Sequence, residues 1–378
     1  MKHIHYIRYL IVSAYSRPCI MEEWQIESAN SIIKSAFEIS NYAIAPKAVR
    51  YEIKGGNLRS DFPNIVRKLE ENGMGASAEL SNGRVAILVY EIKQNQSRWT
   101  SSSHIPRILF VIVVTLVMVD GYYRTENANN VVNIGDPLYN AALYTLALLG
   151  ILGVHEMGHI VASRIHRVKT SWPYFLPGIP IYGIPTFGAF IRSRSHTPNR
   201  IVLFDIAIAG PIAGLCVAII VSVYAAYEAP FIPDYVQEDI VLEDWGNGES
   251  ILMRATLAAF DKDVSDVQIL MTPLLFAAWV GFLLTFLNLL PAWQLDGGHM
   301  ARTVFGTKMH TYATYASLGV LVLLGYWVMA MFIFVLSRRN EGIRPADDIT
   351  KLDSKRKAAY VATLVLAALC APIPAGIL

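Results

Sequence analysis

Long apolar runs separated by polar loops dominate the chain from residue 105 to its end. About six of these runs reach the length of roughly 20 residues that a helix needs to cross the hydrocarbon core of a bilayer. The pattern therefore predicts an α-helical polytopic membrane protein with about six transmembrane helices, embedded in a lipid bilayer. The predicted spans are Ile105–Tyr123, Leu138–Ile165, Val202–Tyr227, Ile269–Pro291, Tyr312–Leu336 and Ala358–Ile377.

The N-terminal part of the chain has shorter apolar runs and mixed charges, the pattern of a small soluble domain. Ala48–Ile53 alternates like a strand, and Ser60 opens a short helix that runs to Asn72. Two further strand-like runs flank Asn82-Gly83, a dipeptide typical of hairpin turns. This order predicts a small α+β domain of βαββ type, preceded by a poorly patterned start.

These patterns divide the chain into an N-terminal domain, residues 1–103, and a membrane core, residues 104–378. The apolar run Tyr9–Ala14 is shorter than the central region of a usual signal peptide, so we do not predict one. Composition agrees with the membrane class, because 54% of the 378 residues are hydrophobic and the mean hydropathy is +0.38. The net charge of +2 does not suggest a nucleic-acid partner, and the three cysteines form no CxxC pair that would indicate a disulfide framework or thiolate metal site.

Basic residues in the loops predict how the spans are oriented, since cytoplasmic loops are enriched in Lys and Arg. The loop after the second span is basic, whereas the loop 228–266 is acidic, so the former is expected inside the cell and the latter outside. We therefore predict a multi-pass protein of the cell membrane with a cytoplasmic N-terminal domain. The segment between the last two spans, 337–357, is also basic, although alternation would place it outside, and the sequence leaves this conflict open.

The second predicted span contains His155-Glu156-Met157-Gly158-His159. Histidines four residues apart lie on one face of a helix, ~6 Å apart along its axis, and both can reach a single zinc ion. Glu156 would then lie beside the metal, where it can accept a proton from water. Because a bilayer tolerates few idle ionisable groups, this setting favours a metal site over a chance pair or two histidines bonded to backbone carbonyls.

A catalytic zinc needs three protein ligands and one open position, so the two histidines require a third group. Asp296 is the best candidate, because it follows the fourth predicted span directly. Pro291 should end the helix just before it, and Gly297-Gly298 let the chain turn closely around a metal. Taken alone, Asp296 would be an ordinary aspartate at a helix end.

Two polar residues near Asp296 in the sequence are further candidates for the site. Asn288 lies one turn before the proline and could donate a hydrogen bond to a substrate carbonyl or its oxyanion. His299 is open to three interpretations, a metal ligand, a partner that holds Asp296, or a simple loop histidine.

The apolar loop Trp172–Ser195 contains several prolines and glycines, which forbid a continuous helix. Its segment Thr186–Ile191 is expected to be extended, giving a re-entrant or interfacial β-like loop. An exposed strand edge near the metal could bind an unwound substrate by strand addition, with Gly188 and Phe190 as substrate-binding residues. The alternative is a loop that only packs on the helices.

Together these motifs resemble the site-2 protease family of zinc intramembrane metalloproteases, in its archaeal and plastid-type branch. The resemblance rests on the His155-Glu156-x-x-His159 motif within a span and on Asn288-x-x-Pro291 leading to Leu295-Asp296-Gly297-Gly298. The match extends to Gly153-Val154, Pro173-Tyr174-Phe175, Gly188-Ala189-Phe190 and Ala209-Gly210-Pro211-x-Ala213-Gly214. The small residues of this last run favour close packing of the third span on the second.

The resemblance implies a zinc-dependent intramembrane endopeptidase that cleaves transmembrane segments of single-span membrane proteins, in regulated intramembrane proteolysis. It implies that His155, His159 and Asp296 bind one Zn²⁺ per chain. It further implies that Glu156 is the general acid/base and that Asn288 assists substrate or oxyanion binding. The sequence gives no indication of the physiological substrate or the oligomeric state.

Two other functions share part of this pattern. A membrane di-iron desaturase or hydroxylase also has His-x-x-x-His near a membrane, but it needs several histidine boxes that the other histidines here do not form. A transporter or non-catalytic receptor, whose polar residues line a pathway, would bind no zinc at these histidines. Metal analysis therefore separates the three functions.

Overall fold

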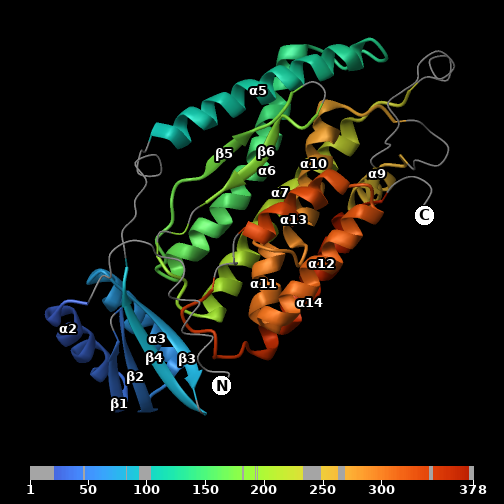
Figure 1. The fold of residues 1–378 in the computed structure, drawn as a ribbon. Coiled ribbons are helices and arrows are strands. Elements are labelled where there is room, and N and C mark those ends of the chain that lie inside the picture. The colour runs from blue at the N-terminus through green and yellow to red at the C-terminus, as the bar shows by residue number, and fades with distance from the viewer. Residues whose placement is uncertain are drawn as a thin grey trace. The chain divides into compact units, whose positions relative to one another are not determined.

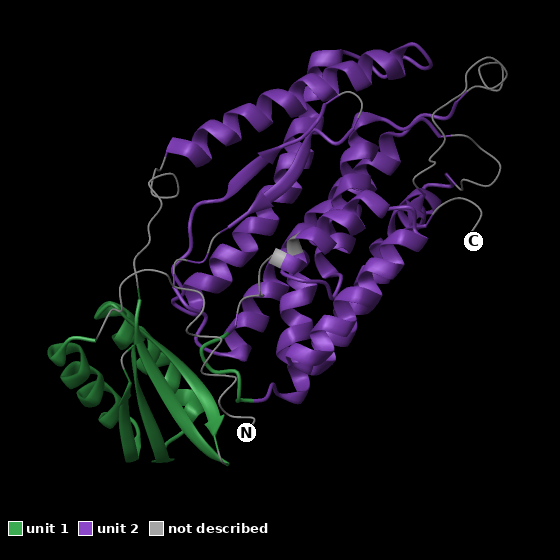
Figure 2. Ribbon diagram, viewed as in Figure 1, with its two compact units in different colours: residues 1–95, 345–350 green, residues 96–344, 351–378 purple. Residues whose placement is uncertain are grey.

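The computed structural model describes residues 21–92 except 46 and 82, residues 104–232 except 181, 182, 192 and 194, and residues 248–262, 269–339 and 344–373. The run Tyr9–Ala14 and about half of the acidic loop 228–266, residues 233–247 and 263–266, fall outside the described residues. The chain forms two compact units (Figure 2). The first comprises residues 1–95 and 345–350, and the second comprises residues 96–344 and 351–378.

The N-terminal unit is an antiparallel sheet with strand order β1-β2-β4-β3 and two helices (Figure 1). The predicted βαββ order corresponds to β2-α3-β3-β4, and the prediction lacked the two elements before it, helix α2 and strand β1. Strand β1 is almost wholly exposed, so its sequence has no alternation, and α2 buries a polar and a small residue, Gln25 and Ala29, beside Ile33. The elements are α2 (Glu23–Lys34), β1 (Glu38–Ala45), β2 (Ala48–Gly55), α3 (Leu58–Glu71), β3 (Met74–Ser81) and β4 (Arg84–Glu91).

A short segment from late in the chain completes this unit. The backbone N–H of Ala78, on strand β3, donates to the carbonyl of Ala346 at 2.7 Å. Asp347 is fully buried, and its carboxylate accepts hydrogen bonds from the backbone of Ile349 and Thr350. Residues 345–350 therefore extend the sheet edge, although the predicted N-terminal domain, residues 1–103, did not include them.

The second unit is helical, and within the described residues three of its helices are long and apolar enough to cross a membrane. These are α5 (His104–Asn129), α6 (Pro137–Ile165) and α7 (Arg200–Glu228), and the apolar helix α10 (Pro273–Leu289) is shorter. Helices α6, α7 and α10 begin after Asp136, Asn199 and Thr272, whose side chains accept a hydrogen bond from the first helical turn. The chain is thus a membrane protein with a helical core.

The fifth predicted span is not one helix. It is a hairpin of α12 (Thr307–Leu323) and α13 (Trp327–Arg339), which pack against each other. Gly325 has φ of +86° and the N–H of Tyr326 donates to the carbonyl of Leu321, which ends α12 with the left-handed turn that glycine permits. Hydropathy gave no sign of this turn, because the residues on both sides of it are apolar.

Helix α14 (Ser354–Cys370) runs in the same direction as α7. Near its start, Arg356 makes two hydrogen bonds of 2.7 Å to the carboxylate of Asp205, near the start of α7. Beyond its end, β8 (Pro372–Ile373) pairs with β7 (Glu249–Ser250), which leads into α9 (Ile251–Ala258) beside the later part of α7. The start of α14 therefore lies at the end of the unit where α7 begins.

This arrangement removes the conflict in the charge pattern. Because α12 and α13 form a hairpin, the chain returns to the end of the unit from which α12 starts. Asp205 pairs with both His166 and Arg356, so the start of α14 lies at the end of the unit where α6 ends and α7 begins. A hairpin in place of the fifth single span is therefore compatible with the charge rule for the residues just before α14.

Candidate metal centre

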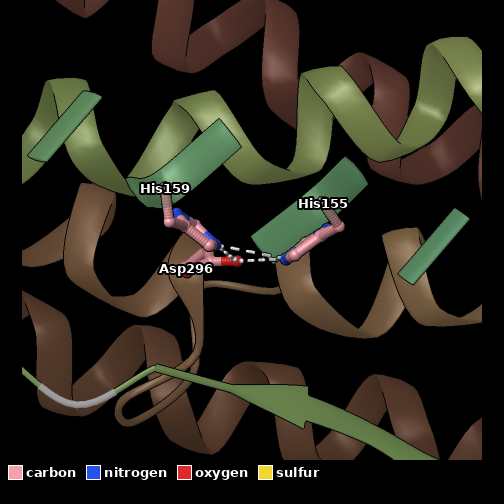
Figure 3. A group of neighbouring side chains, drawn as sticks. All are labelled: His155, His159 and Asp296. Atoms are coloured by element: carbon pink, nitrogen blue, oxygen red, sulfur yellow. Dashed lines mark hydrogen bonds and ion pairs between the residues drawn. The ribbon is translucent and has the colours of Figure 1, made fainter. Parts of the chain in front are cut away.

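The two histidines of the motif lie on consecutive turns of α6 and point to the same side (Figure 3). Both are buried, and their Nε2 atoms are 3.2 Å apart. Nδ1 of His159 is 2.7 Å from the backbone carbonyl of Ile206 on α7. A carbonyl oxygen only accepts, so Nδ1 carries the proton and Nε2 is left with a lone pair for a metal.

Asp296 meets the histidines from a different part of the chain, the first residue of α11 (Asp296–Phe305). Its Oδ2 atom is 3.3 Å from Nε2 of His155 and 3.3 Å from Nε2 of His159. Figure 3 shows the three side chains converging on one point. The structure thus brings together the three residues that the sequence proposed as metal ligands.

The size of this triangle fits zinc. A tetrahedral zinc ion with bonds of about 2.0–2.1 Å separates its ligand atoms by about 3.3 Å. The three ligand atoms are 3.2 to 3.3 Å apart, and two imidazoles with one carboxylate are a donor set that zinc prefers. Three protein ligands also leave the fourth position for water or substrate, as in catalytic sites.

Glycines of α7 allow the catalytic helix to approach. A Cβ atom on Gly210 would overlap the imidazole of His159, and one on Gly214 would lie 3.0 Å from Cβ of His155. In return, a Cβ on Gly158 of α6 would lie 2.5 Å from the carbonyl of Ala209. The interpretation of this small-residue run as a close helix contact is confirmed.

Glu156 is 5% exposed and lies on α6 beside the first histidine. Its Oε2 atom is buried and has no hydrogen-bond partner among the described residues. Buried carboxylate oxygens are rarely left unpaired in proteins, so this atom requires a water or a substrate group as its partner. Glu156 is therefore placed as a base would be, and it does not belong to the group of metal ligands.

Of the two other predicted residues near Asp296, Asn288 reaches the metal group and His299 does not belong to it. The amide Nδ2 of Asn288, in the last turn of α10, is 3.4 Å from Nε2 of His155, so this side chain reaches the edge of the metal group. His299 lies one turn along α11 from Asp296 but does not belong to the group of three. The backbone carbonyl of Ile206 was missed, because no side-chain type signals such a role.

The predicted extended loop is a hairpin of β5 (Tyr174–Pro177) and β6 (Thr186–Phe190). The rings of Tyr174 and Phe190 stack with centroids 5.4 Å apart, and Gly188 has φ of +94°, which favours glycine. Within the described part of the chain, β6 pairs with β5 alone, so its outer edge has no strand partner. Gly188 and Phe190 lie on this strand and outside the metal group.

Comparison with known proteins agrees with this geometry. Residues 143–329 match Peptidase family M50. The probable chloroplastic zinc metalloproteases EGY1 and EGY2 of Arabidopsis thaliana are 33% and 32% identical over 62% and 59% of this chain. The chain spans 43% and 40% of the length of these two relatives. No solved structure matches the chain at a significant level.

Long apolar helices that bring two histidines and an aspartate together form a candidate metal centre of a membrane protein, and zinc is the metal in the names of the two relatives. Residues 143–329 of the chain are those of Peptidase family M50, the site-2 protease family. This match decides against the two rival functions, the di-iron enzyme and the transporter or receptor.

Proposed function

We propose that this chain is a zinc-dependent intramembrane endopeptidase that cleaves the transmembrane segments of single-span membrane proteins, as in regulated intramembrane proteolysis. The observation that carries the proposal is the meeting of His155, His159 and Asp296 beside the unpaired carboxylate of Glu156, on helices that are otherwise apolar. We expect no nucleic-acid partner, since the net charge is only +2.

The chemistry follows from the positions of these side chains. Zinc bound by the three ligands would polarise the scissile carbonyl and lower the pKa of a water molecule. Glu156 accepts the proton of the attacking water and passes it to the leaving amine. The amide of Asn288 donates a hydrogen bond to the oxygen of the carbonyl as negative charge develops there.

A transmembrane substrate presents a further difficulty, because its carbonyls are hidden in intrahelical hydrogen bonds. The unpaired edge of β6 offers backbone groups to an unwound segment, so substrate binds by strand addition. Such binding holds the scissile peptide extended without a strict sequence preference. Gly188 allows the positive φ that the backbone of β6 adopts at this position, and the ring of Phe190 stacks on Tyr174, which stabilises the hairpin.

Replacing Gly188 with Val or Phe190 with Ala is expected to slow cleavage about tenfold and to leave zinc content unchanged, because both residues shape the edge and neither binds metal. Initial rates on a single-span substrate and zinc per chain are the measurements. Ile179→Ala is the matched control, since this side chain is exposed on the same loop. Cleavage at the wild-type rate in both variants would remove the hairpin from substrate binding.

The proposed membrane orientation places the N-terminal unit and both basic segments in the cytoplasm of a cell with this protein in its plasma membrane. Arg356 and Asp205 support it, because their ion pair holds the segment before α14 at the end of the unit where the basic loop lies. The relatives named above are chloroplastic, which is a property of those proteins.

The direct test is to purify the full chain in detergent and offer it a panel of single-span membrane proteins. We expect cleavage within the apolar segment, located by mass spectrometry, that a zinc chelator stops and added zinc restores. Proteins with the same soluble parts but no span serve as the control. Cuts confined to soluble loops, or cleavage that survives complete zinc removal, would refute the proposal.

A further inference from the structure

The turn that carries Asp296 into place contains a backbone conformation unusual for its residue type. Between the end of α10 at Leu289 and the start of α11 at Asp296, Trp293 has φ of +44°. Bulky side chains rarely adopt this left-handed region, and such residues persist only where the surrounding structure holds them. The contacts that hold Trp293 are therefore of interest for the metal centre.

Helix α12 supplies both contacts to the backbone of Trp293. The N–H of Trp293 donates to the Oγ1 atom of Thr314 at 3.0 Å. Its carbonyl is 3.0 Å from Nε2 of His310 and must accept, so His310 donates from Nε2. The hydroxyl of Thr314 in turn donates to the carbonyl of His310 at 2.9 Å, which closes a ring of hydrogen bonds.

Both side chains are suited to fix a position. His310 and Thr314 are buried and lie four residues apart, on one face of α12. Buried, fully paired hydrogen bonds restrict a segment strongly, because breaking them leaves polar groups without partners. Trp293 is thus held at both of its backbone polar groups by a helix that contributes no metal ligand.

The same carbonyl is confined from the other side by α11. A Cβ atom on Gly298 would overlap the carbonyl oxygens of Trp293 and Ala292. Asp296 lies between Trp293 and Gly298 in the sequence. The carbonyl of Trp293 is bonded to His310 and packs closely against Gly298, so the chain is held in place on both sides of Asp296. This leaves the carboxylate little freedom to move away from the histidines.

We propose that His310 and Thr314 are positioning residues for the metal ligand Asp296, acting through the backbone of Trp293. The inference rests on the proposed zinc site but not on the proposed proteolysis. Groups that orient a metal ligand typically change metal affinity by about 10- to 100-fold when they are removed. His310 and Thr314 should therefore control zinc affinity without touching zinc.

The test measures zinc affinity of the full chain in detergent by competition with a chromophoric chelator. His310→Leu is expected to raise the zinc Kd by about 10- to 100-fold. His310→Gln keeps an N–H donor near the position of Nε2 and should restore the Kd to within about threefold of wild type. Thr311→Val, on an exposed face of the same helix, is the control and should leave the Kd unchanged.

A second pair keeps the test decisive if His310→Leu does not fold. Thr314→Val preserves the shape of the side chain and removes the acceptor, whereas Thr314→Ser keeps the hydroxyl. The Kd should rise in the first and stay near wild type in the second. A wild-type Kd in folded Thr314→Val or His310→Leu chains would overturn the proposal.

A purely structural role would lower the melting temperature of the metal-free chain and leave the zinc-induced rise in melting temperature as in wild type, and that result would also overturn the proposal. Binding, and not cleavage, is measured throughout. A chain that binds zinc normally yet cleaves no membrane protein would refute the proposed function alone.

Discussion

Replacing Glu156 with Gln is expected to lower kcat for cleavage of a single-span substrate by about 10²- to 10⁴-fold while zinc stays bound. The amide has nearly the same shape as the carboxylate but cannot accept the proton of the attacking water. Because Glu156 lies outside the group of three ligands, the metal should keep its affinity. Single-turnover cleavage rates and zinc per chain, measured on the same preparation, check both parts.

Glu126→Gln is the matched control for this prediction. It makes the same chemical change on α5, at an exposed position away from the metal centre. Its cleavage rate should equal that of the wild type. If the Glu156→Gln chain with a full zinc complement cleaved within about twofold of the wild-type rate, another group would have to be the base.

Asp296→Ala should remove zinc from the chain and reduce cleavage to background. Two imidazoles remain, which is one ligand fewer than catalytic zinc sites use. Asp296→Asn keeps an oxygen at the same place but loses its negative charge, so it should bind zinc more weakly than wild type and more tightly than the alanine variant. Dialysis against a graded series of chelator concentrations, followed by measurement of zinc per chain, ranks the zinc affinities of the wild type and the two variants.

Asp261→Asn is the control for the charge change, because this aspartate is exposed in the same unit. Its zinc content should match that of the wild type. Full retention of zinc in both Asp296 variants would contradict the assignment. It would direct attention to His299, the alternative ligand that the sequence left open.

The metal ligands were predictable because their geometry depends on few variables. The spacing of His155 and His159 fixes a common helix face whatever the rest of the fold does. Asp296 was harder to predict, since it lies far from the histidines in the sequence, and the prediction depended on its position directly after a span, on Pro291 and on the two glycines that follow it. Long apolar runs likewise gave α5, α6 and α7.

The elements that the sequence missed have little or no pattern to detect. Helices surrounded by lipid are apolar on both faces, so the hairpin at Gly325 interrupts no periodicity. Strand β1 is exposed on both sides, and the structural roles of Ile206 and Trp293 belong to backbone atoms that every residue has. In each case the information lies in three-dimensional neighbours.

Gly210 is a further residue whose role depends on its three-dimensional neighbours. Helix α7 gives no side-chain atom to the metal, yet a single methyl group at this position would occupy the volume of the His159 ring. Alanine, usually the mildest replacement in a helix, would therefore be among the most damaging changes in the chain. The metal centre therefore depends on the absence of a side chain at Gly210 as well as on its ligands. A relative that keeps every metal ligand and the glutamate could still lose catalysis if a larger residue replaced this glycine.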